Sequence, residues 1–186
     1  MGNRGVTLIE MLVAMVILGI MGIALVGFLR AQHQTVLRQN DGVLATQNAR
    51  AAIDMLAREL RNAGFNPRAS ASGGALRTID ADSISWTADL DLDGDTLSSS
   101  TSWDERVTYY QQAQRVTRAS GGGSGTAVTD NVDSLRFTYF DGDGATTADP
   151  ALVEQVRIRL YYSTPDGVQS GMIESQVALR NNIYAN

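Results

Sequence analysis

The segment from Asp89 to Asp95 is the part of this sequence best suited to binding a metal ion. It places a carboxylate at every second position and a glycine where a sharp turn is needed: Asp89, Asp91, Asp93, Gly94 and Asp95. These oxygen ligands match the opening half of a D-x-D-x-D-G calcium loop. The closing bidentate acid would fall on Ser100, so Asp104 or Glu105 would have to close a longer loop. A solvated acidic turn that binds no ion is the alternative, and the residues leave both open.

The rest of the composition is short of catalytic groups. The chain has no Cys and a single His, and all fifteen basic residues are Arg. These counts exclude thiolate chemistry, a multi-His zinc site and Lys-based catalysis, so we expect a protein that is not an enzyme and requires no cofactor. His33 is expected to be a surface or packing residue, and residues 141–144 (Asp-Gly-Asp-Gly) to form a hairpin turn. The net charge of −5 disfavours a nucleic-acid partner.

Residues 6–29 form a long apolar segment that the core of an ordinary soluble domain would not bury. From Met11 to Leu29, nineteen consecutive residues carry no charge, and the apolar character extends back to Val6 apart from one residue, Glu10. A helix over residues 6–29 would span about 36 Å, enough to cross a hydrocarbon core of ~30 Å. The segment is apolar on all sides and longer than the apolar region of a secretory signal, so it predicts a transmembrane anchor.

Glu10 is the only charged residue within this apolar segment. A carboxylate near the centre of a membrane helix costs ~2.5–3.5 kcal/mol, and such residues usually have a partner and a function. Glu10 could lie in the headgroup region, where its charge would cost little. It could instead neutralise a cation that another polypeptide supplies within the bilayer. Position alone does not separate the two.

The hexapeptide Gly5-Val6-Thr7-Leu8-Ile9-Glu10, directly before the apolar run, resembles the type III signal of prepilins. The resemblance implies that a prepilin peptidase cuts after Gly5 and N-methylates Val6. Phe is usual at the first mature position, and Val6 departs from that pattern while remaining apolar. The resemblance also implies that Glu10, the fifth mature residue, pairs with the terminal amine of a neighbouring subunit during assembly. Breaking such a pair in a low dielectric would leave a charge uncompensated, at about 3–5 kcal/mol.

The helical pattern continues beyond the apolar run, and we expect one helix over about residues 7–63. Apolar residues recur on one face, Gly42 is a weak point where a kink could form, and Gly64 is a helix stop. The expected apolar face comprises Val36, Val43, Ile53, Leu56 and Leu60. Residues 47–50 (Gln-Asn-Ala-Arg) and 56–64 (Leu-Ala-Arg-Glu-Leu-Arg-Asn-Ala-Gly) are similar to the stem of PilW-type minor pilins.

The remainder of the chain predicts β-structure. Alternating or β-branched runs occur at residues 83–87, 106–110, 115–118, 134–140, 155–162 and 173–179. We expect them to form an antiparallel sheet on the apolar face of residues 36–63, with Trp86 and Trp103 in the core. The predicted fold is α+β, a pilin-like lollipop. Its parts are a leader (1–5), a transmembrane half-helix (6–29), an amphipathic half-helix (30–64) and a periplasmic head (65–186).

Charge follows the same division. Residues 30–68 carry six Arg and three acids, a net +3, whereas residues 69–186 carry eight Arg and sixteen acids, a net −8. An ordinary solvated helix face and an acidic soluble domain explain this split. Attraction between the stems and heads of adjacent subunits is the alternative, and exposed pairs of this kind contribute only ~0–1 kcal/mol each.

The resemblance therefore implies a minor pilin of the type IV pilus, held in the bacterial inner membrane and then moved into a cell-surface pilus. Its implied partners are prepilin peptidase, other minor pilins, the major pilin and the inner-membrane assembly platform. One alternative is a J-type pseudopilin of a type II secretion system, which shares the stem and fold. Another is a membrane-tethered adhesin or ligand-binding domain whose helix never leaves the bilayer.

Overall fold

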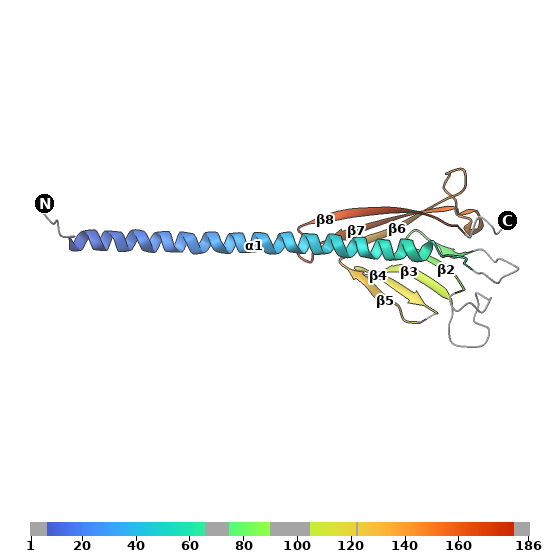
Figure 1. The fold of residues 1–186 in the computed structure, drawn as a ribbon, viewed down its shortest axis with the longest axis horizontal. Coiled ribbons are helices and arrows are strands. Elements are labelled where there is room, and N and C mark those ends of the chain that lie inside the picture. The colour runs from blue at the N-terminus through green and yellow to red at the C-terminus, as the bar shows by residue number, and fades with distance from the viewer. Residues whose placement is uncertain (1–6, 66–74, 90–104, 122, 181–186) are drawn as a thin grey trace. The chain divides into compact units, whose positions relative to one another are not determined.

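A computed structural model of the protein describes residues 7–65, 75–89, 105–121 and 123–180. By its internal contacts the chain divides into two compact units, Met1–Asp41 and Gly42–Asn186. A single helix, α1 (Leu8–Leu60), begins in the first unit and ends in the second (Figure 1). All strands belong to the second unit.

Helix α1 runs for 53 residues, close to the expected limits of 7 and 63. It contains no proline, and Ala, Leu, Arg and Gln favour the helical conformation throughout its second half. Gly64 ends the helical segment in the left-handed region (φ 73°), and its N–H donates to the carbonyl of Thr87 (2.8 Å). The predicted stop is thus observed, and it joins the helix end to the first sheet.

Within the described residues, the first sheet has five antiparallel strands in the order β1-β2-β3-β4-β5. The strands are β1 (Leu76–Ile79), β2 (Ser83–Thr87), β3 (Arg106–Gln112), β4 (Arg115–Ser120) and β5 (Thr126–Asp130). Each strand pairs with the next along the chain, so the sheet is a meander. Trp86 of β2 and Tyr109 of β3 are both buried and stack with ring centroids 5.7 Å apart.

In the part of the chain that the structure describes, the second sheet has three antiparallel strands in the order β6-β7-β8. These are β6 (Val132–Phe140), β7 (Gln155–Ser163) and β8 (Ser170–Ala178), with a short 3-10 helix, η1 (Pro150–Leu152), before β7. Apolar and polar side chains alternate along β6 and β7, so that one face is buried and the other meets solvent. The buried side chains are Leu135, Phe137, Tyr139, Val156, Ile158 and Leu160.

The chain changes sheets at Asn131, between the end of β5 and the start of β6. Asn131 has a positive φ of 59°, a conformation that Asn tolerates better than most side chains. Turns of the first sheet then hold the outer edge of β6: the N–H of Phe137 donates to the carbonyl of Ala81 (2.8 Å), and that of Val132 donates to the carbonyl of Gln114 (3.0 Å). The hydroxyl of Tyr139 also donates to the carbonyl of Asp80 (2.8 Å).

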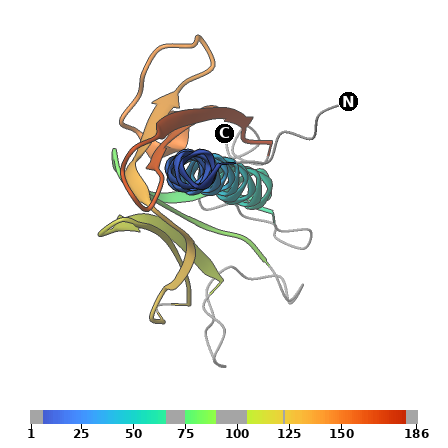
Figure 2. The same cartoon turned by 90° about the vertical axis from the view of Figure 1, so that its left-hand side faces the viewer.

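The core of the second unit lies where the last turns of α1 meet both sheets, which flank these turns in Figure 2. The helix contributes six buried residues: Ala49, Ala52, Ile53, Leu56, Ala57 and Leu60. Ile53, Leu56 and Leu60 confirm the expected apolar face. Val36 and Val43 do not, since they are 52% and 55% exposed. The three alanines were absent from the predicted face, although small side chains let a helix approach a sheet closely.

The structure extends the predicted β-pattern in two ways. Five of the six expected runs fall within strands and the sixth, 173–179, passes the end of β8 by one residue; β1 and β5 were not predicted, and the strands form two sheets instead of one. Helix α1 also continues through Gly42, the proposed kink site. Here the missing side chain gives room to Gln169 of the β7–β8 connection, whose Oε1 would collide with an added Cβ. The predicted core position of Trp86 is confirmed, and Trp103 lies outside the described residues.

Candidate functional site

Glu10 lies in the first turn of α1 and is exposed. Its backbone N–H donates to Oγ1 of Thr7 (3.3 Å), and its carboxylate accepts from the backbone N–H of Thr7 (3.4 Å). This reciprocal pair is a capping box, in which two residues three positions apart satisfy the free N–H groups of a helix start. In the isolated chain, the Glu10 carboxylate therefore binds its own helix end, where the helix dipole favours negative charge.

The capping role of Thr7 was missed in the sequence, although its signal is present. Thr and Glu three residues apart, directly before an apolar run, are the usual signature of a capping box. The two remaining predicted residues of this site, Gly5 and Val6, lie outside the described residues. Cleavage between them and methylation of Val6 stay predictions.

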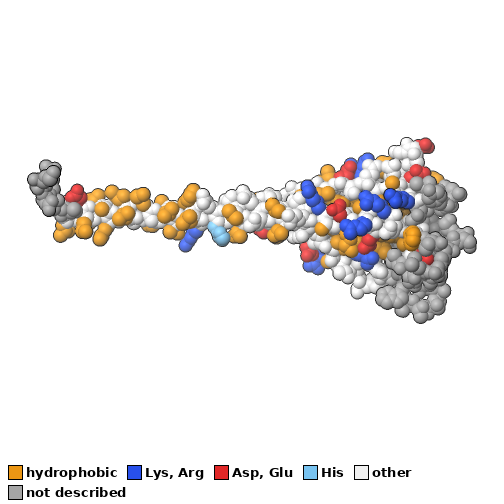
Figure 3. Space-filling model, viewed as in Figure 1, with side chains coloured by type: hydrophobic (Ala, Val, Ile, Leu, Met, Phe, Trp, Pro, Cys, Tyr) orange, Lys and Arg blue, Asp and Glu red, His pale blue; other side chains and the backbone are white. Residues whose placement is uncertain are grey.

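No described residue of the chain buries the apolar part of α1. Every described residue from 7 to 41 is exposed, and large apolar side chains follow one another along the helix (Figure 3). Leu8 is 85% exposed and Ile23 77% exposed. By length and composition this helix could cross a membrane. Since exposed apolar surface costs roughly 25 cal/mol per Å² in water, either lipid or other helices must cover it.

His33 is exposed on α1, as expected for a surface residue. At residues 141–144 the structure has a turn, in which the N–H of Gly144 donates to the carbonyl of Asp141 (3.1 Å). The Asp141 carboxylate accepts from the backbone N–H groups of Asp143 and Ala145. The predicted turn is thus present, within the connection from β6 to η1, and the carboxylate of Asp141 stabilises it.

The acidic segment is described only at its two ends. Asp89 is 1% exposed and Glu105 is 4% exposed. The Asp89 N–H donates to the carbonyl of Phe65 (2.7 Å), and the adjacent Ala88 N–H donates to the carbonyl of Glu105 (3.4 Å). The other four candidate calcium ligands lie outside the described residues: Asp91, Asp93, Asp95 and Asp104. No group of three or more metal-ligating side chains occurs in the described part of the chain, and the calcium site stays a prediction.

A polar contact that no sequence pattern indicated joins the helix to the first sheet. Nε of Arg118 on β4 donates to both carboxylate oxygens of Glu59 on α1, at 2.8 and 3.1 Å. Both side chains are 27% exposed. Burial opposes the charge on Arg118, but the hydrogen bond and the charge of Glu59 raise its pKa above the ordinary value. Burial, together with the charge of Glu59, also raises the pKa of the neighbouring Tyr109.

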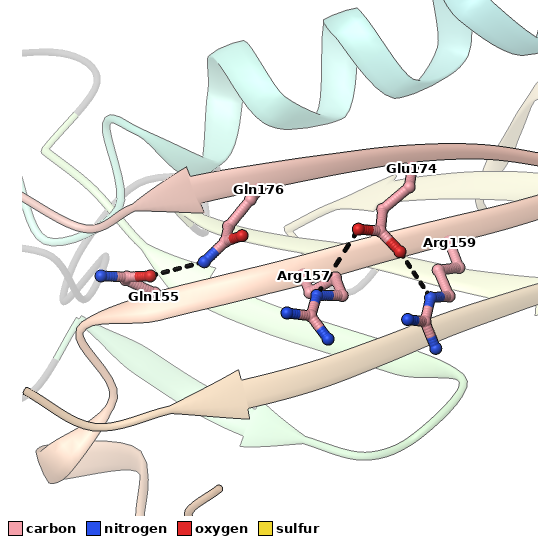
Figure 4. A network of polar contacts seen from close by, with 5 residues as sticks. All are labelled: Gln155, Arg157, Arg159, Glu174 and Gln176. Carbon is pink, nitrogen blue, oxygen red and sulfur yellow. Dashed lines mark hydrogen bonds and ion pairs between the residues drawn. The ribbon is translucent and has the colours of Figure 1, made fainter. Parts of the chain in front are cut away.

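The outward face of the second sheet carries another polar network (Figure 4). Glu174 on β8 accepts a hydrogen bond from Nε of Arg159 on β7 (2.6 Å) and pairs with Nε of Arg157 at 3.6 Å. This bond to Arg159 lowers the pKa of Glu174 below its ordinary value of 4.5. Gln176 donates to Gln155 alongside this pair (2.6 Å). None of these residues was a candidate from sequence.

The long apolar N-terminal helix packed on antiparallel β-sheets defines a pilin-like α+β fold. Residues 1–26 match the family described as the prokaryotic N-terminal methylation motif. The N-terminus is therefore that of a type IV pilin-like or pseudopilin-like prepilin, which implies processing by prepilin peptidase and pilus-type assembly. With this motif and a pilin-like fold, the chain is a structural protein and not an enzyme. No curated protein matches the chain.

Proposed function

We propose that this protein is a minor pilin of the PilW type, which takes part in the assembly or initiation of a type IV pilus. Prepilin peptidase cuts after Gly5 and methylates Val6, and the apolar half of α1 holds the subunit in the inner membrane. The subunit then leaves the lipid for the filament, where other minor pilins and the major pilin surround its helix.

The observation that carries this proposal is the exposure of Glu10 on a helix that its own chain does not cover. A membrane anchor needs no carboxylate at this position, and the charge makes insertion less favourable. An assembling subunit does need one, because a charge in lipid can select a neighbour that supplies the opposite charge. The methylated amine of Val6 in an adjacent subunit is the partner that we propose.

In the isolated chain the capping box holds the Glu10 carboxylate at its own helix start. Assembly would exchange this weak, exposed contact for an ion pair in a low dielectric. Capping and pairing place different demands on the side chain. A Gln at position 10 could still cap the helix but could not pair with an amine as an ion, and a Val at position 7 would remove the Thr hydroxyl alone.

Three variants of the full chain therefore test the proposal in piliated cells: Glu10→Gln, Glu10→Ala and Thr7→Val. We expect all three to be cleaved and methylated at Val6. Both Glu10 variants should lose incorporation into sheared filaments by about a hundredfold, as expected for loss of ~3 kcal/mol of charge pairing. Thr7→Val should retain most of its incorporation. Mass spectrometry of the membrane and filament fractions measures both quantities.

Two outcomes contradict the proposal. If Glu10→Gln enters filaments as well as the wild type, the carboxylate acts as a cap and not as a pairing charge. If the wild-type chain keeps residues 1–5 and never reaches filaments, it is a membrane-tethered protein. Recovery of the chain only in a type II secretion pseudopilus would assign it as a pseudopilin of the J type instead.

A further inference from the structure

The outward side chains of β6, β7 and β8 line up in cross-strand rows. The register pairs Arg136 with Arg159, and Arg159 with Glu174, in one row. The next row contains Thr138, Arg157 and Gln176. The flanking residues on β6 and β7 are buried in the core, so these rows project to the opposite side of the sheet. We call the surface formed by Arg136, Arg157, Arg159 and Glu174 the arginine face.

The arginine face has the opposite charge to the domain that carries it. The face contains three guanidinium groups and one carboxylate, a net +2, whereas residues 69–186 carry a net −8. Glu174 is already engaged by Arg159 and Arg157 (Figure 4). Arg136 is exposed, and it forms no ion pair within the described residues. The face therefore has an excess of positive charge that a partner can neutralise.

Aromatic and apolar groups border these charges. Arg157 lies over the ring of Phe140, 4.7 Å from its centroid. In the row beside Arg136 and Arg159, Tyr161 pairs with Met172, and they are 39% and 49% exposed. They line a hollow of about 550 Å³ together with Asp133, Ser134, Ser170 and Gly171. Tyr, Met and Arg are the residue types enriched at the centres of protein interfaces.

We propose that the arginine face binds an acidic surface on the head of a neighbouring pilin-type subunit. This inference rests on the proposed function, because assembly is what would bring two heads together. Charge complementarity selects an acidic partner, and the Tyr161–Met172 hollow accepts one of its side chains. A nucleic-acid partner fits less well, since Glu174 pairs with two arginines of the face and the surrounding head is acidic.

The first test reverses one charge of the face in the full chain. Arg136→Glu should lower incorporation into sheared filaments by about tenfold, because it places like charge against an acidic partner. Arg77→Glu is the matched control, since Arg77 is an exposed residue on β1 of the other sheet and the change in net charge is the same. Equal membrane levels and complete N-terminal processing of both variants separate docking from folding and from the proposed function.

The second test uses the absence of cysteine from the chain. A single Met172→Cys variant should react with a maleimide in the membrane fraction and be protected in filaments. Arg77→Cys, as its control, should react in both fractions. Two results overturn the inference: incorporation of Arg136→Glu equal to that of Arg77→Glu, or full labelling of the cysteine at position 172 in filaments.

A third result would also overturn the inference. If the purified full chain in detergent binds a short DNA duplex and Arg136→Glu abolishes that binding, the occupant is a nucleic acid. A different result would contradict the proposed function: the wild-type chain would stay unprocessed or would be absent from filaments.

Discussion

The two halves of α1 differ in what covers their apolar side chains. Between Gly42 and Leu60 the helix buries six residues against the two sheets of its own chain. Between Leu8 and Leu29 it buries none, and its side chains are larger and more apolar. The first half thus depends on lipid or on other subunits, whereas the second half is covered by the fold. One helix therefore combines an interaction segment with a segment that forms part of the core of the head.

The largest difference between the halves should appear when a leucine is shortened in each. Leu56→Ala removes a fully buried side chain and should lower the free energy of unfolding of the head by about 2–5 kcal/mol. Leu18→Ala, in the exposed half, should leave head stability unchanged. Urea unfolding of the full chain in detergent micelles, followed by near-ultraviolet circular dichroism, measures both. A cost below about 1 kcal/mol for Leu56→Ala would mean that the helix is not part of the core.

The Glu59–Arg118 pair, on the packed half of α1, should have a larger coupling energy than an ordinary surface ion pair. A double-mutant cycle with Glu59→Ala and Arg118→Ala should give a coupling energy of about 1–3 kcal/mol, because the hydrogen bonds are charged and half-buried. The matched control is the Arg115–Asp130 pair, whose side chains are 61% and 60% exposed. Its coupling should be ~0–1 kcal/mol. Equal couplings would contradict a special role for the helix–sheet contact.

Glycines in the two halves should also respond differently to an added methyl group. Ala favours a helix over Gly by about 1 kcal/mol. Nothing lies within 4 Å of an added Cβ at Gly22, whereas at Gly42 the Cβ would displace Gln169. Gly42→Ala alone should therefore bring little or no gain in head stability, and Gly42→Ala combined with Gln169→Ala should recover about 0.5–1 kcal/mol. Gly22→Ala should not affect unfolding of the head. A full gain from Gly42→Ala alone would show that Gln169 moves aside without cost.

Added calcium tests whether a bound ion contributes to the stability of the head. If the acidic segment that begins at Asp89 binds the ion with a dissociation constant of ~10⁻⁴–10⁻³ M, millimolar calcium should stabilise the full chain by about 0.4–1.4 kcal/mol. The shift in melting temperature in detergent measures this effect, with magnesium as the control ion. No shift, or the same shift in an Asp91→Ala, Asp93→Ala double variant, would remove the calcium site.

The sequence predicted the long helix because its signals are local. The apolar run and the absence of proline can each be read directly from the sequence. The limits of burial could not be read in this way. Val43 and Ile53 look alike in a helical pattern, and only the position of the sheets leaves one exposed and buries the other.

The parts of the head that were missed depend on contacts between distant residues. β5 (Thr126–Asp130) is short and has few large apolar residues, so its conformation follows from pairing with β4. The division into two sheets depends on the backbone of Asn131, a residue that turns, loops and strand ends all tolerate. Glu59 and Arg118 are 59 positions apart, and no periodic pattern links them.

The hydrogen bonds along the outer edge of β6 couple the unfolding of the two sheets of the head. Ala81 and Gln114, in turns of the first sheet, accept from the N–H groups of Phe137 and Val132 in the second. Neither sheet can open along this edge of β6 without breaking the hydrogen bonds that join it to the other sheet. Amide protons in both sheets should therefore exchange with solvent through one shared opening event, and the head should melt as a single cooperative unit.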